Sequence, residues 1–140
     1  MKVLLLQGAN MEALGRREPE LYGTITAAEL DAYLVEQHPD DEIDIRYTNI
    51  EGEAISWIYQ ADLGDHDGLV MNPAGFLHEG MALRDCLKTI KMPYVEVHMT
   101  NIEKRDFTSV TACAADTMVA GLGVGSYTLG IQALRMIVNR

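Results

Sequence analysis

Short apolar segments alternate along the chain with segments whose apolar residues recur at the spacing of a helix. The nearly all-apolar run KVLLLQ, residues 2–7, predicts a buried strand. Four more strands are predicted at EIDIRY (42–47), GLVMN (68–72), YVEVH (94–98) and TMVAGL (117–122). Strands that take turns with helices are typical of right-handed crossovers and of a parallel sheet with both faces covered. The pattern therefore predicts an α/β, flavodoxin-like, doubly wound five-stranded parallel sheet in the order 2-1-3-4-5, with helices on both faces and a single domain over residues 1–140.

Two of the helices predicted between these strands begin at recognisable signals. Thr26 and Glu29 form a capping box, which opens a helix that runs to about His38, where Pro39 follows as a stop signal. Asn49 is predicted to cap the next helix. The helix that Asn49 caps is expected to run through residues 53–63, and further helices are expected over about 80–91 and 126–138.

Composition narrows the class of protein. The chain of 140 residues is 48% hydrophobic and 23% charged, as expected for a soluble globular domain with one core. No apolar run approaches the roughly 20 residues of a membrane span, and the apolar stretch at the N-terminus is too short for a secretory signal. The net charge of −10 argues against nucleic acids and membranes as partners, so an anionic small molecule would need a local cationic or amide-lined pocket. Two cysteines without ligand-like spacing favour a reduced, cytoplasmic setting.

Polar side chains gather where three of the predicted strands end. In a doubly wound sheet the ligand lies beyond the carboxyl ends of the strands. The residues placed there are Asn10, Arg17 and Tyr22 after the first strand, Asn72 and His78 at and after the third, and Glu96, His98, Thr100 and Arg105 at and after the fourth. Each has an ordinary explanation in packing or solvation, but their convergence predicts one site at this edge of the sheet.

The segment LGRREPELYG, residues 14–23, places Arg16 and Arg17 shortly before Tyr22 and fits neither a helix nor a strand. One interpretation is a solvated loop. The other is that the two guanidinium groups stabilise the tyrosinate anion. The whole stretch 8–23 is long for a connection inside a compact domain, and such loops are often lids or binding segments.

No metal or cofactor is predicted. The acidic segment DLGDHD, residues 62–67, lies at the opposite edge of the sheet, where a solvated turn explains it. His78 and His98 do not have the spacing of a zinc motif, and no cysteine joins them. The candidate site therefore favours acid–base chemistry on a small molecule.

Three segments carry a resemblance to a known family. QGANMEALGRREPELYG, MNPAGFLHEGMALRDCLK and VEVHMTNIEKRDF resemble, in order and over nearly the whole chain, the signature segments of type II 3-dehydroquinate dehydratase. The resemblance implies a flavodoxin-like subunit, a dodecamer built as four trimers, and cofactor-free dehydration of 3-dehydroquinate to 3-dehydroshikimate. It leaves open whether the reaction serves aromatic amino acid biosynthesis through the shikimate pathway or quinate degradation.

The resemblance and the chemistry of elimination assign roles to the candidate residues. Proton removal beside a ketone needs a base, a stabiliser for the enolate oxygen, and an acid for the departing hydroxyl. Tyr22, as tyrosinate, is the expected base, and Arg17 and, by resemblance, Arg105 would stabilise its anion. A free tyrosine ionises near pH 10, so holding the anion at neutrality needs about 4 kcal/mol.

The remaining roles concern the enolate, the acid and substrate binding. Asn10 would hold the water that stabilises the enolate, and His98, oriented by Glu96, would protonate the leaving hydroxyl. By resemblance, Asn72 and the backbone amides of Met99 and Thr100 bind the substrate carboxylate and a neighbouring hydroxyl, His78 meets the ring hydroxyls, and Asp85 reaches the site of an adjacent subunit.

Several positions depart from the family pattern. QGAN stands where the family has N-G-P-N, so Ala9 replaces a proline, and Leu77 and Glu79 flank His78 in place of small polar residues. A second arginine expected after R-E-x-F is absent, and Thr108 stands in that region. The alternative interpretation is therefore a divergent paralogue that dehydrates, or only binds, a related cyclic hydroxy acid.

Overall fold

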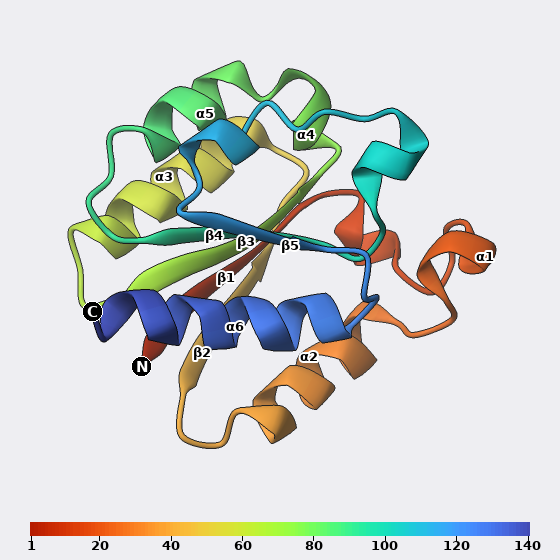
Figure 1. Cartoon of the computed structure of the whole chain (residues 1–140), viewed down its shortest axis with the longest axis horizontal. Helices are drawn as coiled ribbons and strands as arrows, with labels where there is room; N and C mark the ends of the chain where they lie inside the picture. The colour runs from red at the N-terminus through yellow and green to blue at the C-terminus, as the bar shows by residue number, and fades with distance from the viewer.

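The computed structural model describes residues 1–140, and its centre is a parallel sheet of five strands (Figure 1). The strands are β1 Lys2–Ala9, β2 Glu42–Tyr47, β3 Gly68–Ala74, β4 Tyr94–His98 and β5 Thr117–Ala120. All neighbouring strands pair in parallel, in the order β2-β1-β3-β4-β5. The predicted fold class and strand order are confirmed.

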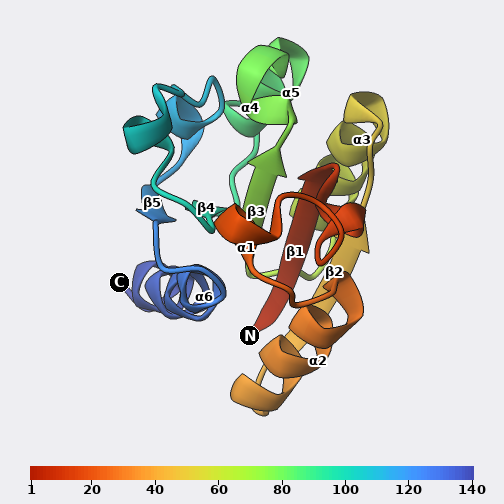
Figure 2. The ribbon, with the colours of Figure 1, turned by 90° about the vertical axis from the view of Figure 1, so that its right-hand side faces the viewer.

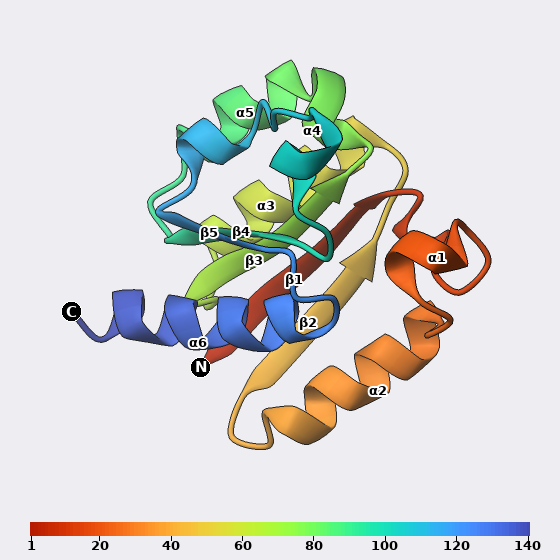
Figure 3. The same ribbon diagram turned by 45° about the vertical axis from the view of Figure 1, so that its right-hand side comes forward.

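Helices cover both faces of this sheet (Figures 1 and 2). One face is covered by α2 (Ala27–Gln37) and α6 (Gly125–Val138), and the other by α3 (Glu51–Asp62) and α5 (Met81–Leu87). The short helix α4 (Phe76–Glu79) leads into α5, and the short helix α1 (Pro19–Tyr22) stands apart from both layers, at the edge where β1 ends (Figure 3). Three single-turn 3-10 helices, Met11–Ala13, Ile102–Arg105 and Ala112–Ala114, lie in connections. None of the helices combines the length and the apolar character needed to cross a bilayer.

The alternation of side chains along the strands divides the core into two clusters. Val3 and Leu5 of β1 pack with α2 and α6, and Leu4 and Leu6 pack with α3 and α5. All four side chains are fully buried. Because both faces of a parallel sheet are covered, β1 needs apolar residues at consecutive positions, which explains the nearly unbroken run at the start of the sequence.

The N-terminus of α2 is capped as predicted. The backbone N–H of Glu29 donates to Oγ1 of Thr26 at 3.2 Å, and the N–H of Thr26 donates to Oε2 of Glu29 at 2.8 Å. These reciprocal bonds satisfy two donors that a helix start leaves without a partner.

The predicted cap of α3 is wrong. The N-cap is Ile50, which makes no side-chain hydrogen bond to the helix. The side chain of Asn49 instead accepts from the backbone N–H of Asn10 at 2.8 Å and donates to Glu12 at 2.6 Å. The side chain of Asn49, which the local pattern assigned to the helix cap, therefore bonds instead to a residue 39 positions away in the sequence.

Two predicted elements extend too far. The helix expected over residues 80–91 ends at Leu87, because the N–H groups of Lys91 and Met92 both donate to the carboxylate of Asp62 at 2.8 Å and draw the chain toward the end of α3. The last strand ends at Ala120, two residues early, because the chain turns at Gly121 with φ 92°.

The segment 8–23 is more regular than predicted. β1 continues to Ala9, and Pro19 opens the four-residue helix α1, where its fixed φ suits the first helical position. Gly23 follows this helix with φ 76° and closes it through a bond from its N–H to the carbonyl of Pro19 at 2.8 Å. The residues between Arg16 and Gly23 are thus held in a defined turn at the sheet edge.

Candidate active site

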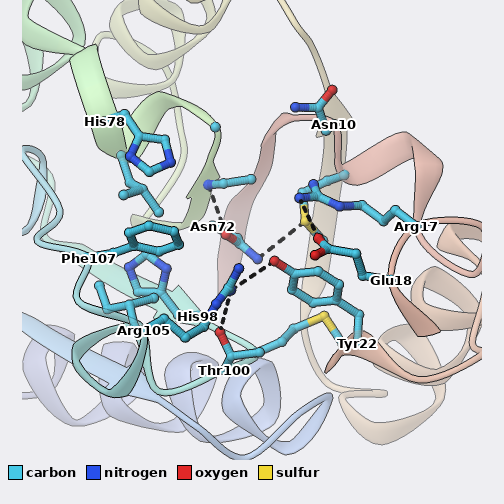
Figure 4. Close-up of a pocket in the computed structure, with 16 residues that line it drawn as sticks. Asn10, Arg17, Glu18, Tyr22, Asn72, His78, His98, Thr100, Arg105 and Phe107 are labelled. Atoms are coloured by element: carbon cyan, nitrogen blue, oxygen red, sulfur yellow. Dashed lines mark hydrogen bonds and ion pairs between the residues drawn. The ribbon is translucent and has the colours of Figure 1, made fainter. Parts of the chain in front are cut away.

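A cavity of about 380 Å³ opens at the carboxyl ends of β1, β3 and β4 (Figure 4). The strand order reverses at this point, because the chain leaves β1 toward β2 on one side and returns to β3 on the other. Such a switch point is where doubly wound sheets bind their ligands. The walls come from three segments, residues 10–22, 72–78 and 98–107.

The structure brings most of the predicted site residues together around this cavity. Those that line it are Asn10, Arg17, Tyr22, Asn72, His78, His98, Met99, Thr100 and Arg105. Glu96 lies directly behind His98, outside the lining. Asp85 does not reach the cavity: it lies on α5 with a side chain 70% exposed, 3.2 Å from the guanidinium of Arg84. Arg16 also lies outside the lining, so only Arg17 of the arginine pair faces the cavity.

Tyr22 is placed between two cations. Nη1 of Arg105 donates to the hydroxyl of Tyr22 at 2.9 Å and to the hydroxyl of Thr100 at 3.0 Å. Arg17 lies over the ring instead, with Cζ 4.9 Å from the ring centroid, and its Nη2 is 3.9 Å from the carboxylate of Glu18. Arg105 is therefore the group that can stabilise charge on the phenol oxygen directly, and Arg17 acts through the ring face.

His98 is held from behind by a buried carboxylate. Its Nε2 lies 2.7 Å from Oε1 of Glu96, which is fully buried. Burial acts to raise the pKa of Glu96, but hydrogen bonds from His98, Ser109, Tyr94 and Thr111 outweigh it and hold that pKa below its ordinary value. An ionised Glu96 makes Nε2 the protonated nitrogen of His98 and leaves Nδ1 for a ligand.

A chain of buried hydrogen bonds fixes the direction of the Asn72 amide. The backbone N–H of Ala74 can only donate, so Oδ1 of Asn72 accepts from it at 3.0 Å, and Nδ2 faces the hydroxyl of Tyr127 at 2.8 Å. Tyr127 then donates to Oε1 of Gln7 at 2.8 Å. The second hydrogen on Nδ2 has only the weak acceptor Sδ of Met11, 3.5 Å away. Asn72 therefore offers the cavity a donor, which suits an anionic oxygen.

An aromatic side chain forms the wall near the second histidine. The rings of His78 and Phe107 meet edge to face with centroids 4.9 Å apart, and Cζ of Arg105 lies 4.9 Å from the Phe107 centroid. Phe107 thus packs against one polar group from α4 and one from the segment after β4. It restricts the orientations of both.

Backbone conformations that side chains disfavour are concentrated at the cavity. The non-glycine residues with positive φ are Asn10 (76°), Glu18 (34°), Ala74 (47°) and Asp106 (56°). Three of them line the cavity, and Asp106 lies between two lining residues. Such conformations persist where the surrounding structure determines them, and they often mark functional sites.

Sequence reasoning missed several residues that shape the site. Glu18 and Phe107 line the cavity, and Tyr94 and Thr111 bind Glu96. Tyr94 carried a usable signal, because Tyr94, Glu96 and His98 alternate along one strand and so share a face. Thr111 carried none, because its loop reaches Glu96 only through the tertiary fold.

The acidic segment 62–67 has structural partners. Asp65 pairs with the ammonium of Lys2 at 2.9 Å, and Asp67 accepts from the Lys2 backbone N–H at 2.7 Å. His66 lies 3.2 Å from Asp44. The structure contains no group of three or more His, Cys, Asp or Glu side chains placed to hold a metal ion.

Comparison with known proteins gives a consistent likeness over the whole chain. Residues 1–135 match the family described as dehydroquinase class II. A 3-dehydroquinate dehydratase of Synechocystis sp. is 42% identical, with 99% of this chain and 93% of that protein aligned. A 3-dehydroquinate dehydratase of Gloeobacter violaceus is 40% identical over 100% of this chain and 90% of its own length.

Solved structures agree with the sequence relatives. The crystal structure of type II dehydroquinase from Butyrivibrio crossotus superposes with a TM-score of 0.92 at 30% identity, covering 96% of this chain and 97% of that one. The type II dehydroquinase from Propionibacterium acnes superposes with a TM-score of 0.89 at 35% identity, covering 99% and 97%. Fold and sequence therefore point to the same group of proteins.

Proposed function

The chain belongs to the class II dehydroquinase family, and from that premise we propose that its cavity catalyses the elimination of water from 3-dehydroquinate to give 3-dehydroshikimate. The enzyme is a hydro-lyase, and the proposed steps use side chains and backbone groups of the chain together with one bound water. Nothing in the relatives favours the alternative of a divergent paralogue.

Tyr22 is the proposed base. As tyrosinate it takes the proton from the carbon beside the ketone, which leaves an enolate. A free tyrosine ionises near pH 10, so keeping a tyrosinate at neutrality needs about 4 kcal/mol. The hydrogen bond from Arg105 to the hydroxyl and the guanidinium of Arg17 over the ring support this role, because both stabilise negative charge on the phenol.

His98 is the proposed acid. The imidazolium donates its Nδ1 proton to the departing hydroxyl, which leaves as water, while Nε2–H stays bonded to Glu96. Asn10, held in its left-handed conformation beside the cavity, would bind the water that stabilises the enolate oxygen. The pocket thus offers a base on one wall and an acid on another.

Substrate binding is assigned to the remaining lining groups. The donor that Asn72 presents and the backbone amides of Met99 and Thr100 would bind the substrate carboxylate and a neighbouring hydroxyl. His78 would meet the ring hydroxyls, with its ring held by Phe107. These assignments rest on the resemblance and on the placement of each group in the lining.

The observation that carries the proposal is the Arg105–Tyr22 hydrogen bond in a cavity that also contains His98. We test it with an ultraviolet assay for the enone formed from 3-dehydroquinate, comparing the wild-type enzyme with Tyr22→Phe. The variant is expected to lose turnover by about a thousandfold. Binding of 3-dehydroshikimate should change only a few-fold, because the lost group acts chiefly in the transition state.

The control is Tyr33→Phe, because Tyr33 lies on α2 and does not line the cavity. It should behave as wild type. Near wild-type turnover in Tyr22→Phe would place the base elsewhere, and a wild-type enzyme that forms no enone would end the proposal.

We also propose a trimer-based homo-oligomer, with a dodecamer of four trimers as its full form. The resemblance supports it, as do the exposed Asp85 and large exposed apolar side chains such as Leu63 (86%) and Met136 (70%). Light scattering should give twelve times the 15.5 kDa mass of the chain. A stable monomer at micromolar concentration would contradict it.

A cytoplasmic location is likewise a proposal, which rests on the cysteine content.

A further inference from the structure

Strand β4 presents a row of three polar side chains on one face. Tyr94, Glu96 and His98 alternate with Val95 and Val97, and the polar three lie on the face covered by α5 while the two valines pack with α6. All three polar residues are buried, with exposures of 1%, 0% and 3%. The row runs from the core to the cavity, where His98 forms part of the lining.

The carboxylate in the middle of this row accepts three hydrogen bonds. His98 Nε2 lies 2.7 Å from Oε1 of Glu96. The hydroxyls of Tyr94 and Thr111 donate to Oε2 at 2.5 Å and 2.7 Å. Since Thr111 gives its only proton to Glu96, it must accept from Ser109, whose Oγ is 3.0 Å away. These are the titratable and hydroxyl groups that face the carboxylate, from β4 and from the loop between the second and third 3-10 helices.

The segment that supplies Thr111 is fixed in place. Thr111 is fully buried and Ser109 is 7% exposed. The backbone N–H of Val110 donates to the carbonyl of Leu77 at 2.9 Å, which ties the segment to α4 beside the cavity. The hydroxyl of Thr111 is therefore held against Glu96 by the backbone as well as by Ser109.

We propose that Tyr94 and Thr111 are positioning residues that set the acid strength of His98 through Glu96. The proposal rests on the proposed role of His98 as the acid. When the imidazolium gives up its Nδ1 proton, the charge of Glu96 loses its cationic partner. The hydrogen bonds from the two hydroxyls stabilise the Glu96 carboxylate more strongly once His98 is neutral. They therefore favour the state in which His98 has lost its Nδ1 proton.

Removing either hydroxyl makes the Glu96–His98 pair hold its protons more tightly. We expect Tyr94→Phe and Thr111→Val each to move the His98 titration, followed by the ¹⁵N shifts of its imidazole, upward by about half to one pH unit. The descending limb of the kcat profile with 3-dehydroquinate should move in the same direction, and the plateau of kcat should fall about three- to tenfold. KM should stay within about twofold, because neither hydroxyl touches substrate.

Two further choices keep the test decisive. Tyr33→Phe removes a phenol hydroxyl outside the site and should leave both the titration and the profile of wild type. Should Tyr94→Phe fail to fold, Thr111→Val, which keeps the side-chain shape, carries the measurement alone. If Thr111→Val folds and its His98 titrates at the same pH as in wild type, the inference is overturned, whether or not Tyr94→Phe folds.

The titration also separates this inference from the proposed function. A wild-type enzyme that forms no enone would refute the function, while the ¹⁵N titration would still report on the coupling between the hydroxyls and His98. Active variants with an unmoved titration would refute the coupling and leave the function standing.

Discussion

The two arginines beside Tyr22 are expected to contribute unequally, and this can be measured by replacing each with methionine. Arg105 donates to the phenol oxygen at 2.9 Å, where the charge of a tyrosinate is concentrated. Arg17 faces the ring at 4.9 Å from its centroid, where it attracts the phenol as well as the anion. Arg105→Met should therefore weaken the base more than Arg17→Met.

The magnitudes follow from the two geometries. A hydrogen bond to a charged group contributes about 1.5–3 kcal/mol, so losing Arg105 should lower kcat at neutral pH about ten- to 150-fold. A cation over an aromatic face contributes about 0.5–2 kcal/mol, only part of which distinguishes the anion from the phenol. Arg17→Met should therefore cost about three- to tenfold.

The assay is the pH dependence of enone formation from 3-dehydroquinate. In Arg105→Met the ascending limb should move to higher pH, and activity should recover as the phenol ionises without help. Arg105→Lys should rescue part of the loss, because lysine restores the charge but not the planar donor. Arg16→Met is the matched control, since Arg16 precedes Arg17 but lies outside the cavity. A profile of Arg105→Met parallel to wild type at every pH would refute the reasoning and reduce the arginine to a substrate contact.

Two further predictions concern pH and the position of Asn10. Burial lowers the pKa of His38 in the folded chain, and the nearby carboxylate of Asp41 offsets this only in part. As the pH falls through about 6.5, the histidine is therefore protonated in the unfolded chain before it is protonated in the folded chain, so the free energy of unfolding decreases. The drop in Tm between about pH 7.5 and 5.5 should therefore be smaller in His38→Gln than in wild type, and equal drops would count against it. Asn49→Ala should lower kcat about tenfold without loss of far-ultraviolet helix signal, because Asn49 holds the backbone of Asn10 and does not cap α3. A kcat equal to that of wild type would show that Asn10 keeps its place unaided.

The sequence was sufficient to predict the fold because its signals are local. An apolar run that must be buried on both faces and a capping box within one turn are visible in consecutive residues, and both were confirmed at β1 and α2. Asn49 shows the limit of this reasoning. Its side-chain amide could cap the helix that follows or bond to a residue distant in sequence, and only the fold shows that it accepts from the backbone N–H of Asn10.

The candidate site divides in the same way. Residues at strand ends could be placed together, because the carboxyl ends of parallel strands share one edge, and they do line the cavity. The division of labour between Arg17 and Arg105 could not be predicted, because it depends on which guanidinium reaches the hydroxyl. Thr111 could not be found for a similar reason, since it lies in a loop and its partner Glu96 lies 15 positions away in β4.

Gly8 connects the fold to the site, and its replacement by alanine is the last prediction. The ladder between β1 and β3 pairs Gln7 with Asn72 and Ala9 with Ala74, so Gly8 lies beside Pro73, which has no N–H to donate. A Cβ at Gly8 would lie 2.1 Å from the carbonyl oxygen of Pro73 and 2.6 Å from its carbonyl carbon. Backbone in the middle of a sheet cannot give way by that amount without moving its neighbours.

Gly8→Ala is therefore expected to cost about 3 kcal/mol or more, which lowers Tm by roughly 10 °C in a chain of this size. It should also lower kcat, because Pro73 is bonded to Asn72 and Ala74, both of which line the cavity. Gly52→Ala is the matched control. Gly52 lies in α3, and a Cβ there would have no atom within 4 Å apart from its chain neighbours and the backbone of its own helix, so alanine should raise Tm by about 3 °C through its helix propensity. A Gly8→Ala enzyme with the Tm and kcat of wild type would show that β1 and β3 can separate at the switch point, and the close approach there would then have no part in shaping the site.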